Sequence, residues 1–116
     1  MIEGSCHCGA VHVSVETAPE DVTSCNCSIC RRTGGLWAYY KPGDVRIDGE
    51  TDTYIWGDKS LRLHRCKMCG NVTHWSPMDP TYERMGVNVR MMAPEILAAA
   101  RVRKFDGADT WTFIGE

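Results

Sequence analysis

Seven cysteines in a chain of 116 residues constrain this protein more than any other feature of its sequence. They form three groups, which are Cys6 and Cys8, then Cys25, Cys27 and Cys30, then Cys66 and Cys69. A disulfide framework fits poorly, because the number is odd and the N-terminal residues lack the basic and apolar regions of a secretory signal. Buried structural thiols would not be expected to cluster so tightly. The spacing therefore predicts metal binding, and zinc is a metal that clustered thiolates commonly hold.

Two of the three groups are pairs that cannot each satisfy a structural zinc ion alone. The segment Cys66–Gly70 is a common zinc half-site, in which Gly70 can take a positive φ and let backbone N–H groups approach the sulfurs. The first pair, Cys6 and Cys8, can converge at the end of a strand, where residues i and i+2 share a face. Joining both pairs gives a closed four-thiolate site between the N-terminal strand and a hairpin about sixty residues later.

The remaining three thiols lie within a six-residue loop, at Cys25, Cys27 and Cys30. Three protein ligands with an open fourth position are typical of a reactive zinc ion. Three thiolates and Zn²⁺ sum to a charge of −1, so this zinc would be a weak Lewis acid, suited to a soft sulfur ligand. We therefore predict two zinc ions per chain, one structural and one catalytic.

A histidine could instead fill the fourth position of the triplet and make that site purely structural. The candidates are His7, His12, His64 and His74. His12 is expected on the polar face of a strand, and His7 is expected to point away from the metal of its neighbours. His64 and His74 flank the Cys66–Gly70 half-site and could instead orient the ligands.

Residues that follow the triplet are candidates for binding a substrate. Arg31 and Arg32 could offset the negative charge of the site and bind carboxylates of an incoming molecule. Gly34 and Gly35 form a turn whose backbone can approach a ligand closely. A solvated basic pair is the alternative for the two arginines.

The rest of the sequence predicts one mainly β domain, residues 1–116, with antiparallel sheets and one short helix. Val11, Val13 and Val15 alternate with polar residues, as in a half-buried strand. Further strands are expected at 36–40, 45–48, 53–57, 61–65, 71–76, 86–91 and 101–105. Residues 94–100 are expected to form the helix, with Pro94 in its first turn.

Composition excludes several classes of partner. The net charge of −2 offers no basic surface for nucleic acid or an anionic membrane. No apolar run approaches the roughly 20 residues that span a bilayer. Reduced thiols and the absence of a secretory signal favour the cytoplasm.

The ordered motifs Gly4-x-Cys6-x-Cys8-Gly9, Cys25-x-Cys27-x-x-Cys30-Arg31-Arg32 and Cys66-x-x-Cys69-Gly70 carry a family resemblance. The chain resembles the glutathione-dependent formaldehyde-activating enzyme family, which includes centromere-protein-V-like domains. The resemblance implies small antiparallel sheets arranged around zinc sites, with the four paired thiols as structural ligands and the triplet as catalytic ligands. It also implies carbon–sulfur lyase activity, in which S-(hydroxymethyl)glutathione interconverts with glutathione and formaldehyde.

These observations favour a zinc-dependent lyase that acts on a small-molecule thiol or a thiol–aldehyde adduct. No strong acid–base group is evident; His64, Asp58 and Tyr54 are weak candidates. A non-enzymatic, zinc-stapled module that binds a partner protein is the main alternative. A dithiol redox role is disfavoured, because Cys66 and Cys69 lack the βαβ context of thioredoxin-like proteins.

Overall fold

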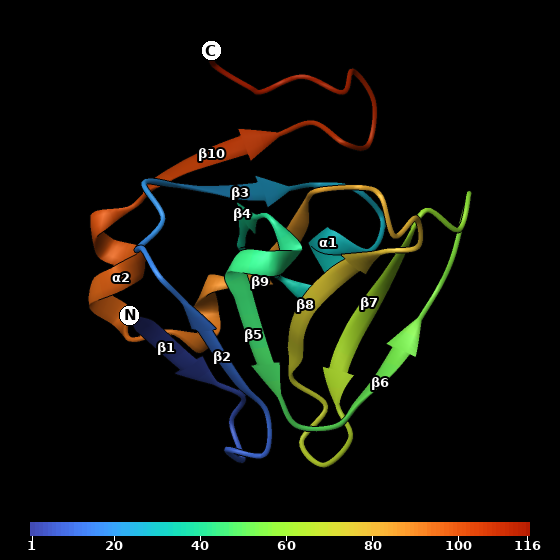
Figure 1. Ribbon diagram of the computed structural model, residues 1–116. Helices are drawn as coiled ribbons and strands as arrows, with labels where there is room; N and C mark the ends of the chain where they lie inside the picture. Colours follow the sequence, from blue (N-terminus) through green and yellow to red (C-terminus); the bar gives the residue numbers. More distant parts are fainter.

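The computed structural model describes residues 1–116 and confirms a mainly β fold with only two short α-helices (Figure 1). A three-stranded antiparallel sheet contains β1 (Ile2–Ser5), β2 (His12–Val15) and β5 (Val45–Asp48), in that spatial order. Val11, Val13 and Val15 are at most 1% exposed, whereas His12 faces solvent. The alternation predicted for this segment is therefore confirmed.

A seven-stranded sheet supplies most of the remaining structure. Its strands, in spatial order, are β10 (Arg101–Phe105), β3 (Asp21–Cys25), β4 (Trp37–Tyr40), β9 (Met85–Asn88), β8 (Val72–Pro77), β7 (Leu61–Cys66) and β6 (Thr51–Tyr54). Neighbouring strands are antiparallel except β10 and β3, which are parallel, with Phe105 opposite Cys25. This register places the end of β10 beside the first thiol of the triplet.

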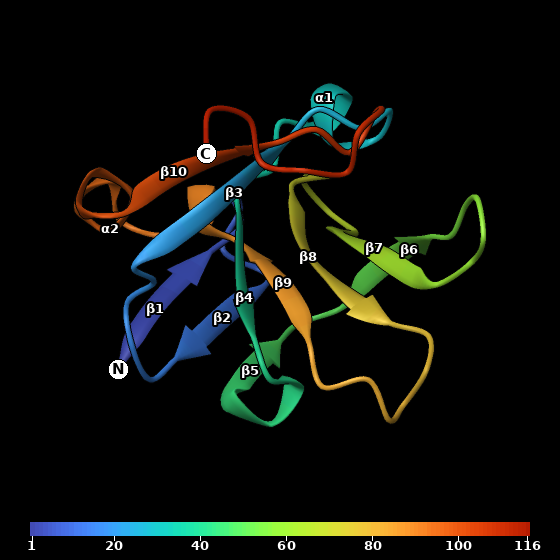
Figure 2. The same cartoon turned by 90° about the horizontal axis from the view of Figure 1, so that it is seen from above.

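The helices are short and close the ends of the sheets. They are α1 (Cys30–Thr33), η1 (Pro42–Asp44), η2 (Val89–Met91) and α2 (Pro94–Ala99). Both views place α2 near β1 and β10 and far from β6 and β7 (Figures 1 and 2). Ile96 and Leu97 of α2 pack against the main hydrophobic core, which contains Val22, Val87 and Val89. No helix has the length and apolar character that crossing a bilayer requires.

No range was predicted for β1, which was expected only as a strand ending near the first cysteine pair, and β3, α1, η1 and η2 were not predicted. Gly4 interrupts the pattern of β1, yet the strand needs it, because a Cβ there would lie 2.7 Å from the carbonyl oxygen of Met91. In β3 most residues are polar, although Val22 and Thr23 are buried. The helix α1 is a single turn that starts at a metal-ligand candidate, too short to leave a periodic signal.

Two predicted strands have boundaries that differ by more than one residue in the structure. The strand expected at 86–91 ends at Asn88, whose side-chain oxygen accepts a hydrogen bond from the backbone N–H of Arg90 and begins η2. The strand expected at 53–57 lies instead at Thr51–Tyr54, because the backbone N–H of Lys59 bonds the carbonyl of Trp56 and forms a turn.

Candidate metal centres and the adjoining cavity

The two cysteine pairs converge, as the sequence predicted. Cys6 follows β1 and Cys8 lies in the turn after it, while Cys66 ends β7 and Cys69 lies in the hairpin before β8. Cys8 Sγ is 3.7 Å from Cys6 Sγ and 3.6 Å from Cys66 Sγ, and all four sulfurs lie within 4.8 Å of one another. A tetrahedron of sulfurs at about 2.3 Å from zinc has edges of about 3.8 Å. The four thiols therefore fit a closed metal site.

Backbone N–H groups stabilise the thiolates of three cysteines in this four-sulfur group, Cys6, Cys66 and Cys69. The N–H of Val11 donates to Cys6 Sγ at 3.3 Å, and the N–H of Met68 donates to Cys66 Sγ at 3.4 Å. Gly70 has a φ of 75°, as predicted, and its N–H bonds the carbonyl of Cys66 at 3.0 Å. Backbone hydrogen bonds, chiefly from Asn71, lower the pKa of the Cys69 thiol to about 6. These donors stabilise the charged form that binds metal.

The triplet also converges, on a separate part of the molecule. Cys25 ends β3, Cys27 lies in the following loop and Cys30 begins α1, and the three sulfurs lie within 4.8 Å of one another. The N–H of Cys27 donates to Cys25 Sγ at 3.5 Å, and the indole N–H of Trp37 donates to Cys30 Sγ at 3.4 Å. In Figure 1, α1 lies well above the lower edge of the molecule, where the β1–β2 and β7–β8 turns lie near each other.

Burial distinguishes the triplet from an ordinary solvent-exposed cluster. Desolvation raises the pKa of the Cys30 thiol to about 12, although the indole N–H of Trp37 acts in the opposite direction. Three thiolates at this position would need a compensating positive charge. A divalent cation supplies that charge, so the donor set fits a metal ion.

No histidine, aspartate or glutamate joins either sulfur group. His64 of β7 and His74 of β8 stack on each other, with ring centroids 3.9 Å apart. The two ring nitrogens of His64 bond Thr51 Oγ1 at 2.9 Å and Ser76 Oγ at 2.7 Å. His74 Nδ1 bonds Thr73 Oγ1 at 2.8 Å, and neither histidine belongs to the triplet.

We expect the buried His74 to make the protein less stable as the pH falls. Burial lowers the pKa of His74 to about 3, against 6.5 for an unperturbed histidine. Below pH ~6.5 His74 is protonated in the unfolded chain but stays neutral in the folded chain. The free energy of unfolding therefore falls progressively towards pH ~3. At about 1.4 kcal/mol per pKa unit, the full effect is on the order of 4 kcal/mol.

The measurement is the free energy of unfolding in urea between pH 5 and 7.5 for the wild type and for His74→Gln. The variant should show a flatter profile of unfolding free energy against pH. Acid release of metal affects both proteins alike, so the difference between them at each pH isolates the effect of His74. His12→Gln, at an exposed position of β2, is the matched control. Parallel profiles for wild type and His74→Gln would contradict the assignment.

A cavity of about 890 Å³ opens beside the triplet, and all three of its cysteines line it. Most of its wall is apolar, and its aromatic side chains are Trp37, Tyr39, Trp56, Trp75, Tyr82, Phe105, Trp111 and Phe113. Arg84 also lines it, with its guanidinium 3.7 Å from the centroid of the Tyr39 ring and in no ion pair. The cavity could hold a small organic molecule with its sulfur at the triplet.

None of the predicted substrate-binding residues lines the larger cavity. Arg31, Gly34 and Gly35 line a second cavity of about 310 Å³, which Cys25 and Cys30 also border. Arg32 lines neither cavity, and its guanidinium donates to the carbonyl of Ser28 at 2.7 Å.

Sequence reasoning missed many of the residues that line these cavities. Examples are Arg90 and Lys104 at the smaller cavity and Trp111 and Phe113 at the larger one. All four are far from the triplet in sequence, and only pairing of the sheet brings them near it.

The fold and its sulfur groups define a mainly β protein with two candidate metal centres, one closed and one bordering a cavity. The chain belongs to the glutathione-dependent formaldehyde-activating enzyme family, whose model matches residues 1–106. A crystal structure of a Rhodobacter sphaeroides protein is similar, with a TM-score of 0.72 and 33% identity, covering 87% of this chain and 99% of that one. A curated Halomonas elongata protein that carries the family's name is 41% identical over 56 residues, 47% of this chain. That match spans 33% of the curated relative.

Proposed function

We propose that this protein is a zinc-dependent carbon–sulfur lyase that acts on thiol–aldehyde adducts such as S-(hydroxymethyl)glutathione. The observation that carries the proposal is a triplet of thiols on the wall of a cavity large enough for a small organic molecule. No histidine, aspartate or glutamate of the chain joins this triplet as a fourth ligand. The family name, shared with the Halomonas elongata relative, supports glutathione and formaldehyde as the chemical theme.

The reaction requires no oxidant or reductant. In an adduct RS–CH₂OH the carbon–sulfur bond breaks, its electron pair goes to sulfur, and the hydroxyl proton leaves as the carbonyl forms. Zinc bound by the triplet would supply a fourth position that holds the sulfur as a thiolate and lowers its pKa. The chain must therefore orient the adduct and accept one proton.

Particular residues fit these two tasks. Trp37 fixes Cys30 through its indole hydrogen bond, and Gly35 permits this packing, because a Cβ there would lie 2.5 Å from the Trp37 ring. Asp58 is a carboxylate on the cavity wall and could take the proton directly or through water. His64 is not on that wall, and neither is Tyr54, which stacks on Trp56.

The four-thiol group would hold a second, structural zinc ion, with Cys6, Cys8, Cys66 and Cys69 as ligands. All seven cysteines are free thiols in the structure. This state suits the cytoplasm, where we place the protein and where thiols stay reduced.

The direct test is zinc coordination with and without a thiol. We expect two zinc ions per chain. Without glutathione, X-ray absorption should show a mean of between three and four sulfur ligands per zinc ion, and this mean should rise towards four when glutathione is added. S-Methylglutathione, which has no free thiol, is the control and should leave the spectrum unchanged. An unchanged spectrum with glutathione would refute an exchangeable position and favour a zinc-stapled interaction module.

A further inference from the structure

The family match ends at residue 106, yet the ten residues beyond it help to build the cavity. We call residues 107–116 the return segment, because it folds back along β10 (Figure 2). Trp111 and Phe113 of this segment line the larger cavity. They face a space whose other walls come from residues inside the family match.

Backbone and ring contacts fix the return segment in place. The N–H of Asp106 bonds the carbonyl of Thr112 and the N–H of Ile114 bonds the carbonyl of Lys104, both at 2.8 Å. The Phe105 ring makes edge contacts with Trp111 and with Phe113, each with centroids 5.0 Å apart.

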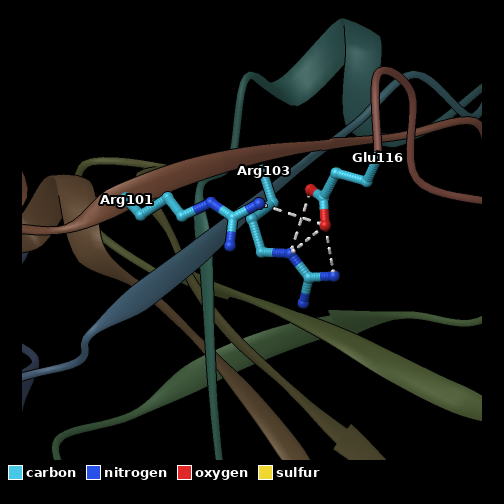
Figure 3. Close-up of polar contacts among 3 residues, drawn as sticks. All are labelled: Arg101, Arg103 and Glu116. Carbon is cyan, nitrogen blue, oxygen red and sulfur yellow. Dashed lines mark hydrogen bonds and ion pairs between the residues drawn. The ribbon is translucent and has the colours of Figure 1, made fainter.

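An ion-pair cluster holds the far end of the segment (Figure 3). Glu116 accepts hydrogen bonds from Arg103 Nε and Nη2, the latter at 2.8 Å, and Arg101 Nη2 lies 3.1 Å from the same carboxylate. Arg103 also lies over the Phe113 ring, with its guanidinium carbon 3.6 Å from the centroid. The position of Phe113 is thus set by β10.

The near end of the segment touches the triplet. A Cβ at Gly107 would lie 2.5 Å from Cys25 Sγ, so the backbone passes directly against the thiol. The Asn26 side chain donates to Asp106 Oδ1 at 3.1 Å and accepts from the N–H of Ala108 at 3.0 Å. The segment and the triplet loop are therefore one connected unit.

Trp111 is an unusual residue within this unit. Its φ of 60° is in the left-handed region, which is uncommon for an aromatic residue and carries a conformational cost. It is 71% exposed although it lines the cavity. A large ring held in this way offers apolar surface that a bound molecule would cover.

We propose that the return segment determines substrate specificity, with Trp111 and Phe113 selecting thiol adducts that carry an aromatic group. This rests on the proposed function in that the substrate sulfur lies at the triplet. The cavity wall carries two negative and two positive side chains, so their charges sum to zero and give little electrostatic preference for a polyanion. These side chains are Asp58, Lys59, Asp79 and Arg84. Aromatic rings dominate the rest and prefer edge or offset contact with another ring.

The test is calorimetric binding of two primary thiols, benzyl mercaptan and 2-mercaptoethanol, to the zinc-loaded protein, with turnover of their formaldehyde adducts measured by NMR. We expect the wild type to bind benzyl mercaptan at least ~10-fold more tightly, and Trp111→Ala to lose that ~10-fold preference. Trp111→Phe should retain most of it. Ile114→Ala, an exposed residue of the same segment that lines only the smaller cavity, is the matched control and should bind as the wild type does.

The possible outcomes distinguish the specificity role of the return segment from the proposed lyase activity. Equal binding of the two thiols by the wild type, or a preference that survives Trp111→Ala, would overturn the specificity role even if both adducts turn over. A preference that Trp111→Ala abolishes, without turnover of either adduct, would support the specificity role and refute the lyase. Failure of both thiols to bind would overturn the specificity role.

Discussion

Replacing Cys66 by serine is expected to leave most of the protein unfolded at room temperature. Cys66 is 2% exposed and belongs to the main core, and its sulfur lies 3.6 Å from that of Cys8 across two distant parts of the chain. Structural zinc contributes about 10–16 kcal/mol in small zinc-dependent folds, whereas a domain has only about 5–15 kcal/mol of stability in total. Loss of one ligand also leaves a polar hydroxyl in the core.

Far-ultraviolet circular dichroism and urea titration would measure this effect. Cys27→Ser is the matched control, because it removes one thiol from the other group and leaves the core unchanged. We expect the control to unfold cooperatively at a urea concentration near that of the wild type. A Cys66→Ser variant with the stability of the wild type would show that the four-thiol group does not hold the fold together.

Two thiols of the four-sulfur group lie deeper than any thiol of the triplet, which fits the different roles proposed for the two groups. Cys6 and Cys66 are core residues, each with 2% exposure, whereas Cys8 and Cys69 are exposed, so a metal bound by all four would join β1 to the β7–β8 hairpin from the edge of the core. The triplet residues are only partly buried and none belongs to the core. A metal there would contribute less to stability and would remain accessible from the cavity.

The partition of the thiols could be predicted from the sequence because spacing alone limits which sulfurs can share one ion. Two short-range pairs and one compact triplet have few ways to satisfy zinc, and the structure brings together those groups. The strand β2 could also be predicted from its alternating valines, since alternation of apolar and polar residues is typical of a half-buried strand.

The cavity could not be predicted in the same way. Trp111 and Phe113 reach the triplet only because β10 pairs in parallel with β3 and places Phe105 beside Cys25. Arg31 and Arg32 are adjacent in sequence but point in different directions from the helical turn α1. Arg31 lines the smaller cavity, whereas the guanidinium of Arg32 donates to the carbonyl of Ser28. Such positions depend on long-range pairing and on helix phase, which residue spacing does not encode.

Replacing Cys27 by serine is expected to abolish turnover of thiol–aldehyde adducts while the fold persists. Cys27 lines the larger cavity, and replacing its thiol leaves only Cys25 and Cys30 to hold the metal. Changes to residues that merely orient metal ligands cost about 10–100-fold in activity or affinity. Loss of a ligand should therefore lower turnover at least ~100-fold and reduce the zinc content from two ions to one.

Zinc analysis and NMR exchange of S-(hydroxymethyl)glutathione on the same sample would test both parts together. Ser28→Ala, next in sequence and on the same cavity wall, is the matched control and should keep both metal ions and at least about half the turnover. Full turnover by a Cys27→Ser protein with one zinc would remove the triplet from catalysis. The proposed chemistry requires a metal with an open position at the triplet, so a variant that cannot hold a metal there would have no place to bind the substrate sulfur.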